Sequence, residues 1–177
     1  QRLSLFLVNR YADIVYVTSE PDRVHFPNKK VVVIRGGVDT KDTYNSSDMP
    51  NQYDAIFIGR FHYQKGVLEL IDIWNEVTKF HYNAKLCMIG DGPLFGDVLN
   101  KIKKLGLENN INCVGYKNGE AKNILIRRSK MVVHPATYDS GGMACAEAMV
   151  WGLPAIGFDL PAYKTYYAKG MVKANNN

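Results

Sequence analysis

Residues 130–158, KMVVHPATYDSGGMACAEAMVWGLPAIGF, decide the fold of this chain. The segment begins with a short apolar strand, Met131 to His134, and a proline follows at once. After a polar loop, a small apolar helix is expected from Met143 to Trp151, and a second apolar strand from Pro154 to Phe158. A strand, a helix and a strand in this order form the unit from which parallel sheets are built.

The loop inside this segment has the composition of an anion site. Asp139 is a favoured residue for capping the start of a helix. The Gly141–Gly142 pair that follows is expected to leave backbone N–H groups bare at the helix start, where they suit a phosphate.

Glu147 is the only charged residue of the predicted helix and has apolar neighbours on both sides. Burial of a carboxylate is costly unless it is hydrogen-bonded. The side chain therefore either faces water on an amphipathic helix or points from the sheet edge toward a ligand with hydroxyl groups. Asp139 precedes it by eight positions, and two acids that flank a glycine pair suit a ligand with both hydroxyls and phosphates.

Composition narrows the class of protein. The chain has 177 residues, of which 46% are hydrophobic, enough for one core of ordinary size. Its net charge of +5 fits an anionic ligand or an acidic membrane surface, but no basic block with interleaved aromatics predicts nucleic-acid binding. Cys87, Cys113 and Cys145 lie in apolar runs without a CxxC motif, which predicts buried reduced thiols and a cytoplasmic protein.

Apolar strands alternate with helices along the rest of the chain, which predicts an α/β fold with a doubly wound parallel sheet, Rossmann-like and covered on both faces. Further strands are expected at Ile14–Val17, Val31–Ile34, Ala55–Gly59, Lys85–Gly90, Ile111–Gly115 and from Met171. Further helices are expected at Lys65–Phe80, Leu94–Leu105, Gly119–Ser129 and Ala162–Lys169. The polar stretch 39–52 reads as a linker between residues 1–38 and a domain at 53–177.

Ligands of such sheets bind at the carboxyl ends of the strands, and the loops there carry signals. The loop 59–66 holds Arg60 and Lys65 near a helix start, so it is either a diphosphate clamp or a solvated turn. The loop 115–118 holds Tyr116, whose ring either meets a nucleotide base or packs against the protein.

Taken in order, these loops resemble the donor-binding half of retaining glycosyltransferases of the two-Rossmann-domain (GT-B) type. This is the large family of glycogen-synthase-like and mannosyltransferase-like enzymes, often numbered family 4. The matching pieces are Gly59-Arg60 with Lys65-Gly66, Gly90-Asp91-Gly92-Pro93, the stretch Asp139 to Glu147 with Ala148-Met149, and Gly152-Leu153-Pro154. Residues 1–38 are similar to the end of that family's N-terminal domain and its crossover.

The resemblance implies roles for individual residues. Arg60 and Lys65 would bind the donor diphosphate, Glu147 would hold the ribose hydroxyls, and Asp139 would face hydroxyls of the transferred sugar. Asp139, Arg60 and Lys65 are the catalytic candidates under this resemblance. The remaining donor-binding candidates are Gly59, Gly66, Tyr116, Gly141 and Gly142.

The resemblance also implies partners. The donor would be a UDP- or GDP-sugar, and its departing diphosphate would be stabilised by the cations, without a cofactor or a bound metal. The chain has no DxD pair, and its four histidines are spread out, so only packing or surface roles are expected for them. The acceptor, a glycan or a lipid-linked glycan, would be held by an N-terminal domain, with peripheral association of the full-length protein at the inner face of the membrane.

Two departures from the family pattern stand out. The family's first acid is usually Glu, whereas Asp139 has about 1.5 Å less reach. The chain also reads as a fragment that lacks most of the acceptor-binding domain, so it is expected to bind a nucleotide sugar but to turn over poorly alone.

Three alternatives to transfer use the same or a similar sheet architecture. The same fold also serves nucleotide-sugar binding modules without activity and nucleotide-sugar epimerases, and both stay open at this point. A nicotinamide dehydrogenase requires G-x-G-x-x-G after the first strand and an acid about 20 residues later. The loop 59–66 lacks that spacing.

Overall fold

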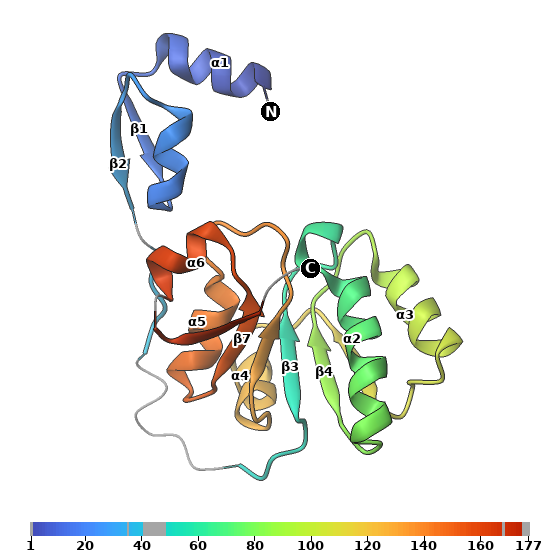
Figure 1. Cartoon of the computed structure of the whole chain (residues 1–177). Coiled ribbons are helices and arrows are strands. Elements are labelled where there is room, and N and C mark those ends of the chain that lie inside the picture. Colours follow the sequence, from blue (N-terminus) through green and yellow to red (C-terminus); the bar gives the residue numbers. More distant parts are fainter. Residues whose placement is uncertain (1, 35, 41–48, 168, 175–177) are drawn as a thin grey trace.

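Six parallel strands form the central sheet of the computed structural model, which describes residues 2–34, 36–40, 49–167 and 169–174 (Figure 1). Their spatial order is β5-β4-β3-β6-β7-β8. The strands are β3 (Ala55–Ile58), β4 (Leu86–Ile89), β5 (Ile111–Gly115), β6 (Val132–His134), β7 (Ala155–Phe158) and β8 (Met171–Ala174). The chain winds outward from β3 to β5, returns beside β3, and winds outward again to β8. This is the predicted doubly wound, Rossmann-like sheet.

The central strands have no solvent-facing side, which is why their sequences are apolar throughout. All four residues of β3 and all four of β4 are buried. Alternate residues of β3 supply two separate cores: Ala55 and Phe57 belong to one, and Ile56 and Ile58 to the other. The sheet is therefore covered on both faces along its centre.

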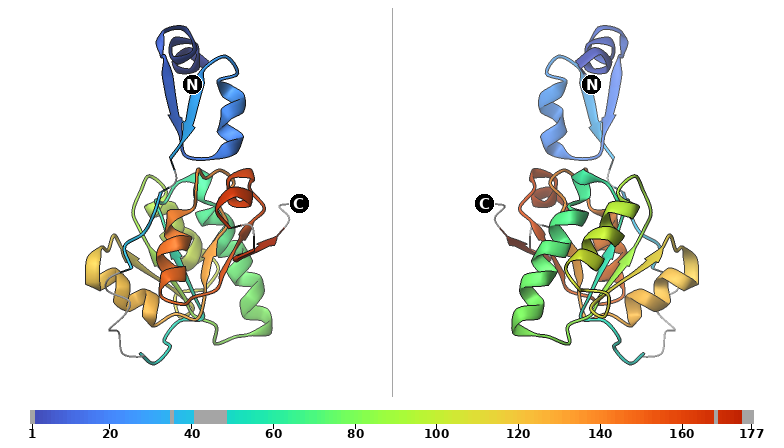
Figure 2. Two further views of the ribbon diagram at one scale, coloured as in Figure 1. Left: turned by 90° about the vertical axis from the view of Figure 1, so that its left-hand side faces the viewer. Right: turned by 90° about the vertical axis from the view of Figure 1, so that its right-hand side faces the viewer.

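Helices cover the two faces in two groups (Figure 2). The first core contains residues of α2 (Val67–Phe80) and α3 (Phe95–Lys104), which connect β3 to β4 and β4 to β5. The second core contains residues of α4 (Gly119–Arg127), α5 (Met143–Val150) and α6 (Pro161–Tyr166). The two groups lie on opposite faces because the chain winds in opposite directions from β3 and because crossovers between parallel strands are right-handed as a rule.

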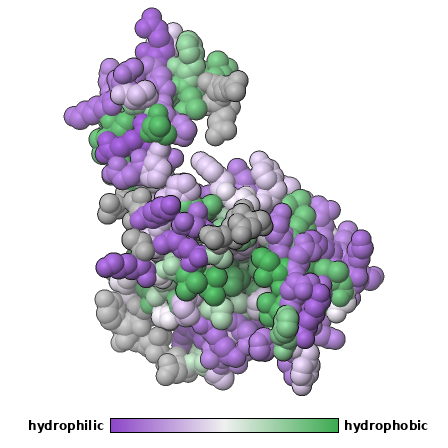
Figure 3. Space-filling model, viewed as in Figure 1, coloured by the Kyte–Doolittle hydropathy of each residue, from purple (hydrophilic) through white to green (hydrophobic). Residues whose placement is uncertain are grey.

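One half of a sheet face carries an apolar hollow of about 530 Å³. Its walls are side chains of α2 and of the three strands β6, β7 and β8, among them Trp74, Val133 and Phe158. Figure 3 views the molecule from this side, and hydrophobic side chains gather near the middle of the view. No helix from the described part of the chain lies over β7 and β8 on this face.

The helices predicted around the sheet differ from the observed ones by one to three residues at one or both ends. The helix expected from Lys65 begins at Val67, because Gly66 adopts left-handed backbone angles (φ +65°) between a short 3-10 turn, η3 (Tyr63–Lys65), and α2. The helix expected to reach Lys169 ends at Tyr166. Most of the predicted linker, residues 41–48, lies outside the described residues.

The N-terminal segment forms a small unit of its own (Figure 1). It contains α1 (Arg2–Tyr11), β1 (Ile14–Val17), η1 (Glu20–His25) and β2 (Lys30–Val33), and β1 pairs with β2 in a separate parallel sheet. Its link to the larger unit includes a hydrogen bond from the hydroxyl of Tyr166 to the carbonyl of Thr18. The strands predicted at Ile14–Val17 and Val31–Ile34 are thus present, but they do not join the main sheet.

The three cysteines are free thiols, as predicted, although Cys113 is only partly buried. Burial raises the pKa of Cys87 and of Cys145 to about 12, and that of Cys113 to about 11. They are therefore packing residues rather than reactive ones. Across the described residues, no helix has the length and apolarity to cross a membrane.

Candidate functional site

The loops that follow β3, β4 and β6 contact one another at the carboxyl edge of the sheet. A side chain at Gly66 would place its Cβ 2.0 Å from the carbonyl oxygen of Pro135, and one at Gly90 would place it 1.8 Å from that of Gly59. Both glycines also have positive φ angles, so the close approach requires glycine at these positions. The backbone N–H of Thr137 donates to the carbonyl of Gln64, which is a second contact between the loop after β6 and the loop after β3.

Two adjoining cavities open at this edge, and both are lined by Ile58 and Gly59 at the end of β3. The larger has a volume of about 520 Å³ and lies between the loops after β3, β4 and β5 and the start of α4. Its polar and charged lining consists of Arg60, Asp91, Tyr116, Lys117, Asn118 and Lys122. The smaller has a volume of about 260 Å³ and is lined by Lys65, His134 and the loop 139–144.

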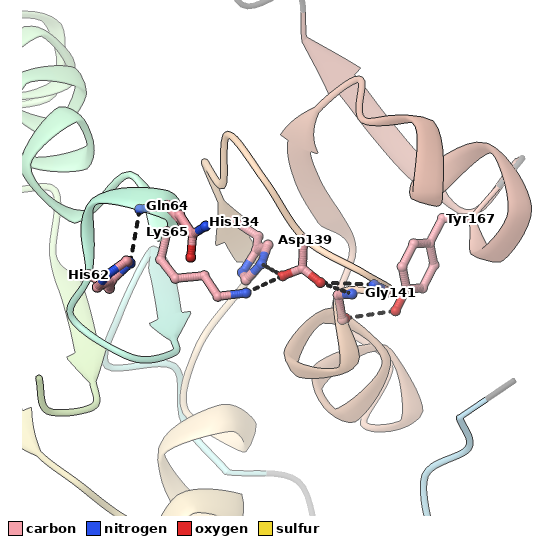
Figure 4. Close-up of polar contacts among 8 residues, drawn as sticks. His62, Gln64, Lys65, His134, Asp139, Gly141 and Tyr167 are labelled. Atoms are coloured by element: carbon pink, nitrogen blue, oxygen red, sulfur yellow. Dashed lines mark hydrogen bonds and ion pairs between the residues drawn. The ribbon is translucent and has the colours of Figure 1, made fainter. Parts of the chain in front are cut away.

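Asp139 is the most highly connected side chain of the smaller cavity (Figure 4). Its Oδ2 accepts hydrogen bonds from the Lys65 ammonium and from His134 Nε2, the latter at 2.9 Å. Its Oδ1 accepts the backbone N–H groups of Gly141 at 2.9 Å and of Gly142 at 2.6 Å. The carboxylate is thus held from three segments: the loop after β3, the end of β6 and the start of α5.

These contacts decide the charge of Asp139, whose side chain is only 8% exposed. Burial by itself raises the pKa of the carboxyl group. The hydrogen bonds from His134, Lys65, Gly141 and Gly142 outweigh burial and hold the pKa well below its usual range. Asp139 is therefore an anion at any physiological pH.

The prediction of bare N–H groups at Gly141 and Gly142 is wrong for this structure, because the Asp139 carboxylate caps both. The glycine pair has a packing reason instead. A Cβ at Gly141 would lie 3.2 Å from the ring of Tyr166, and one at Gly142 would lie 2.9 Å from the ring of Tyr163. The rings of α6 therefore occupy the space that side chains would need.

The next two N–H groups of the helix are available. Those of Met143 and Ala144 have no hydrogen-bond partner within the described part of the chain, and both residues line the smaller cavity. Backbone donors at a helix start favour an anion. The backbone donors that an anion could meet therefore lie two residues further toward the helix than predicted.

His134 is a site residue that the sequence analysis missed. Its side chain is 2% exposed, and its ring stacks on Phe57 with centroids 6.1 Å apart. Because the ionised Asp139 carboxylate can only accept, Nε2 of His134 carries the proton in their hydrogen bond. The only sequence signal was a histidine at the end of an apolar strand, immediately before the loop.

Glu147 lies one turn into α5 and is 35% exposed. Its carboxylate pairs with the ammonium of Lys122 on α4 at 2.8 Å, and Lys122 lines the larger cavity. Lys122 is not among the site residues predicted from the sequence. Glu147 therefore stands beside the larger cavity, whereas Asp139 lines the smaller one.

The structure brings the predicted residues to one edge of the sheet but divides them between the two cavities. Arg60 and Tyr116 line the larger cavity, and Lys65, Gly141 and Gly142 line the smaller one, while Gly59 lines both. Gly66 lies outside both linings and acts through the close approach to Pro135. Within the described residues, no group of three or more His, Cys, Asp or Glu side chains is placed to hold a metal ion.

Comparison with known proteins identifies the family. The model of the family "Glycosyl transferases group 1" matches residues 40–174. The chain belongs to this family. Solved glycosyltransferases with the GT-B fold have the same architecture, and the chain corresponds to their C-terminal domain.

Two curated glycosyltransferases are similar over most of the chain. AmsD of Erwinia amylovora, an amylovoran biosynthesis glycosyltransferase, is 31% identical over 84% of the chain and 44% of its own length. An uncharacterized glycosyltransferase of Methanocaldococcus jannaschii is 30% identical over 85% of the chain and 40% of its own length. The chain thus spans less than half the length of either relative.

Among solved structures, Anabaena HepE in complex with UDP-glucose has the same fold, with a TM-score of 0.79. The alignment covers 99% of the chain and 54% of HepE at 22% sequence identity.

Proposed function

We propose that this chain binds a nucleoside-diphosphate sugar, UDP- or GDP-linked, and is the donor side of a retaining glycosyltransferase. The whole protein would transfer the glycosyl group to a glycan or lipid-linked glycan in polysaccharide, glycolipid or related synthesis. The observation that carries the proposal is the pair of adjoining cavities at the end of β3, with cations and acids arranged along both.

The larger cavity has the lining expected for a nucleoside. Tyr116 offers a ring that is 69% exposed, on which a base can stack. Glu147, oriented by Lys122, offers carboxylate oxygens to two neighbouring ribose hydroxyls.

The smaller cavity has the lining expected for the diphosphate and the sugar. The N–H groups of Met143 and Ala144 and the ammonium of Lys65 would donate to phosphate oxygens, and Arg60 lines the adjoining larger cavity. Negative charge grows on the departing diphosphate during transfer. Positive groups fixed at this position would stabilise that charge, which is the main electrostatic contribution expected of the site.

Relatives support the same reaction class. AmsD is named for the biosynthesis of amylovoran, and HepE was solved with UDP-glucose. AmsD and the Methanocaldococcus relative are both named as glycosyltransferases, so an epimerase or an inactive binding module is not favoured.

Thermal stabilisation tests the proposal directly, because a ligand that binds only the folded state raises the melting temperature. The chain would be heated with UDP, UDP-glucose, GDP or GDP-mannose, and with ADP and NAD as comparison ligands. We expect either UDP and UDP-glucose or GDP and GDP-mannose to raise the melting temperature. At a hundredfold excess of ligand over Kd, the free energy of unfolding should increase by about 2.7 kcal/mol. Stabilisation by none of the four, or equal stabilisation by NAD, would contradict the proposal.

A variant control is needed because a nucleotide can also bind weakly to a basic surface. Glu147→Gln removes one charge beside the larger cavity and keeps the shape of the side chain. Stabilisation by the preferred nucleotide should shrink in this variant, whereas nonspecific binding would not change.

A further inference from the structure

We propose that Asp139 is a positioning residue, which holds Lys65 and the Gly141–Gly142 loop in place and does not bind the transferred sugar. This inference rests on the proposed function, since it assigns a role within the same donor site. It differs from the role implied by the resemblance, in which the side chain at this position faces sugar hydroxyls.

The first support is the number of donors around the carboxylate. A carboxylate has two oxygens with about four acceptor sites in all. Lys65 and His134 occupy Oδ2, while the N–H groups of Gly141 and Gly142 occupy Oδ1. A sugar hydroxyl could donate to Asp139 only by displacing one of these four donors.

The second support is the difference in exposure between the Asp139 and Lys65 side chains. Asp139 is 8% exposed, whereas Lys65 is 27% exposed. An ammonium has three donors, so Lys65 keeps two for phosphate oxygens after one is given to Asp139. Both side chains line the smaller cavity, and the ammonium is the more accessible of the two to a ligand there.

The third support is His134, which leaves Asp139 little freedom to turn toward a ligand. The imidazole is 2% exposed and has the rings of Phe57 and Tyr163 as neighbours, with centroid distances of 6.1 and 6.3 Å. A buried ring reorients less freely than an exposed one, so its Nε2 helps to hold one oxygen of Asp139 in place. His134 is thus the second positioning residue of this cluster.

A comparison of two ligands separates this role from sugar binding. Wild-type and Asp139→Asn chains would be titrated by calorimetry with a nucleoside diphosphate and its sugar conjugate, taking UDP with UDP-glucose or GDP with GDP-mannose, whichever stabilises the wild type. A positioning residue changes both affinities by the same factor, to within about twofold. Loss of affinity for the conjugate alone would overturn the inference, because it would show that Asp139 contacts the sugar.

A double-mutant cycle with Lys65 then separates positioning from a purely structural role. Lys65→Met is expected to weaken diphosphate binding about tenfold or more in the wild-type background. In the Asp139→Asn background the same change should matter less than about threefold, because the ammonium is no longer held in place. An equal loss in both backgrounds would mean that Asp139 only stabilises the fold, and would overturn the inference.

Asp54→Asn is the matched control. Asp54 is also a carboxylate with a lysine partner, Lys130, and a backbone donor, Lys85, but it lies at the opposite end of β3. Its substitution should leave both affinities unchanged. If the wild-type chain binds neither nucleotide pair, the proposed function itself fails, and this inference falls with it.

Discussion

Asp139 and Glu147 are eight residues apart, on one loop and the helix that follows it, yet the protein uses the two carboxylates differently. Asp139 is 8% exposed and has four donors from three segments of the chain, whereas Glu147 is 35% exposed and has one lysine partner. The acceptor sites of Asp139 are occupied by donors of the protein itself, whereas Glu147 has acceptor sites left for a ligand. A pair of acids in a sequence motif therefore need not be a pair of ligands.

Asp139→Ala should give the largest change in stability. Among the described residues, it removes the only acceptor of two backbone N–H groups and of His134 Nε2, which are all at least partly buried. Because unpaired buried donors are costly, we expect a loss of about 2–4 kcal/mol in the free energy of unfolding. Urea denaturation of the two chains measures it, and a loss below about 1 kcal/mol would contradict the hydrogen-bond network described here.

The contribution of Asp139 should also depend on pH. Its folded-state pKa lies below the unfolded value of about 3.9, so its contribution is complete above that pH and declines as the pH falls below it. The stability difference between wild type and Asp139→Asn, measured by urea denaturation from pH 6 down to about pH 3, should stay constant at first and then shrink. A difference that grows on acidification would mean that the pKa is raised instead.

Glu147→Gln should reverse the pattern and affect binding more than stability. Its ion pair is partly exposed, and such pairs contribute about 0–1 kcal/mol to folding. Loss of a charged acceptor for ribose should weaken nucleotide affinity by about 1–3 kcal/mol, roughly fivefold to more than a hundredfold. Calorimetry with the preferred nucleotide measures this, and unchanged affinity would return Glu147 to the alternative of a solvent-facing residue.

Arg60 should show the smallest effect, because it is exposed and screened by salt. Raising the salt concentration from about 0.1 M to about 1 M shortens the screening length from about 10 Å to about 3 Å, so nucleotide affinity should fall. Arg60→Met should reduce both the affinity and this salt dependence. Affinity that is independent of salt would argue against a diphosphate site at this edge.

Much of the fold was predictable because its signals are local. Apolar strands such as β3 and β4 are recognisable without knowledge of their neighbours, and the alternation with helices fixed the parallel topology. The errors lay where a distant contact decides the local conformation. Gly66 delays the start of α2 because its backbone lies against Pro135, about seventy residues later in the chain.

The site was only partly predictable for the same reason. The residues of the motif were found, but the role of each depends on partners from other segments. The sequence gives only a weak signal for His134 and none for Lys122, because the role of each depends on the carboxylate that the fold places beside it. The glycine pair was assigned to ligand contact, whereas the rings of α6 that exclude a side chain there come from another helix.

The most direct test of the division between the two acids is a crystal structure of the chain with its preferred nucleotide sugar, UDP-glucose or GDP-mannose. The account predicts that Glu147 lies within about 3.2 Å of the ribose hydroxyls. It also predicts that Asp139 keeps Lys65, His134, Gly141 and Gly142 as its donors, with no sugar hydroxyl within the same distance. A sugar hydroxyl bound to Asp139, or a nucleotide bound away from Glu147, would contradict it.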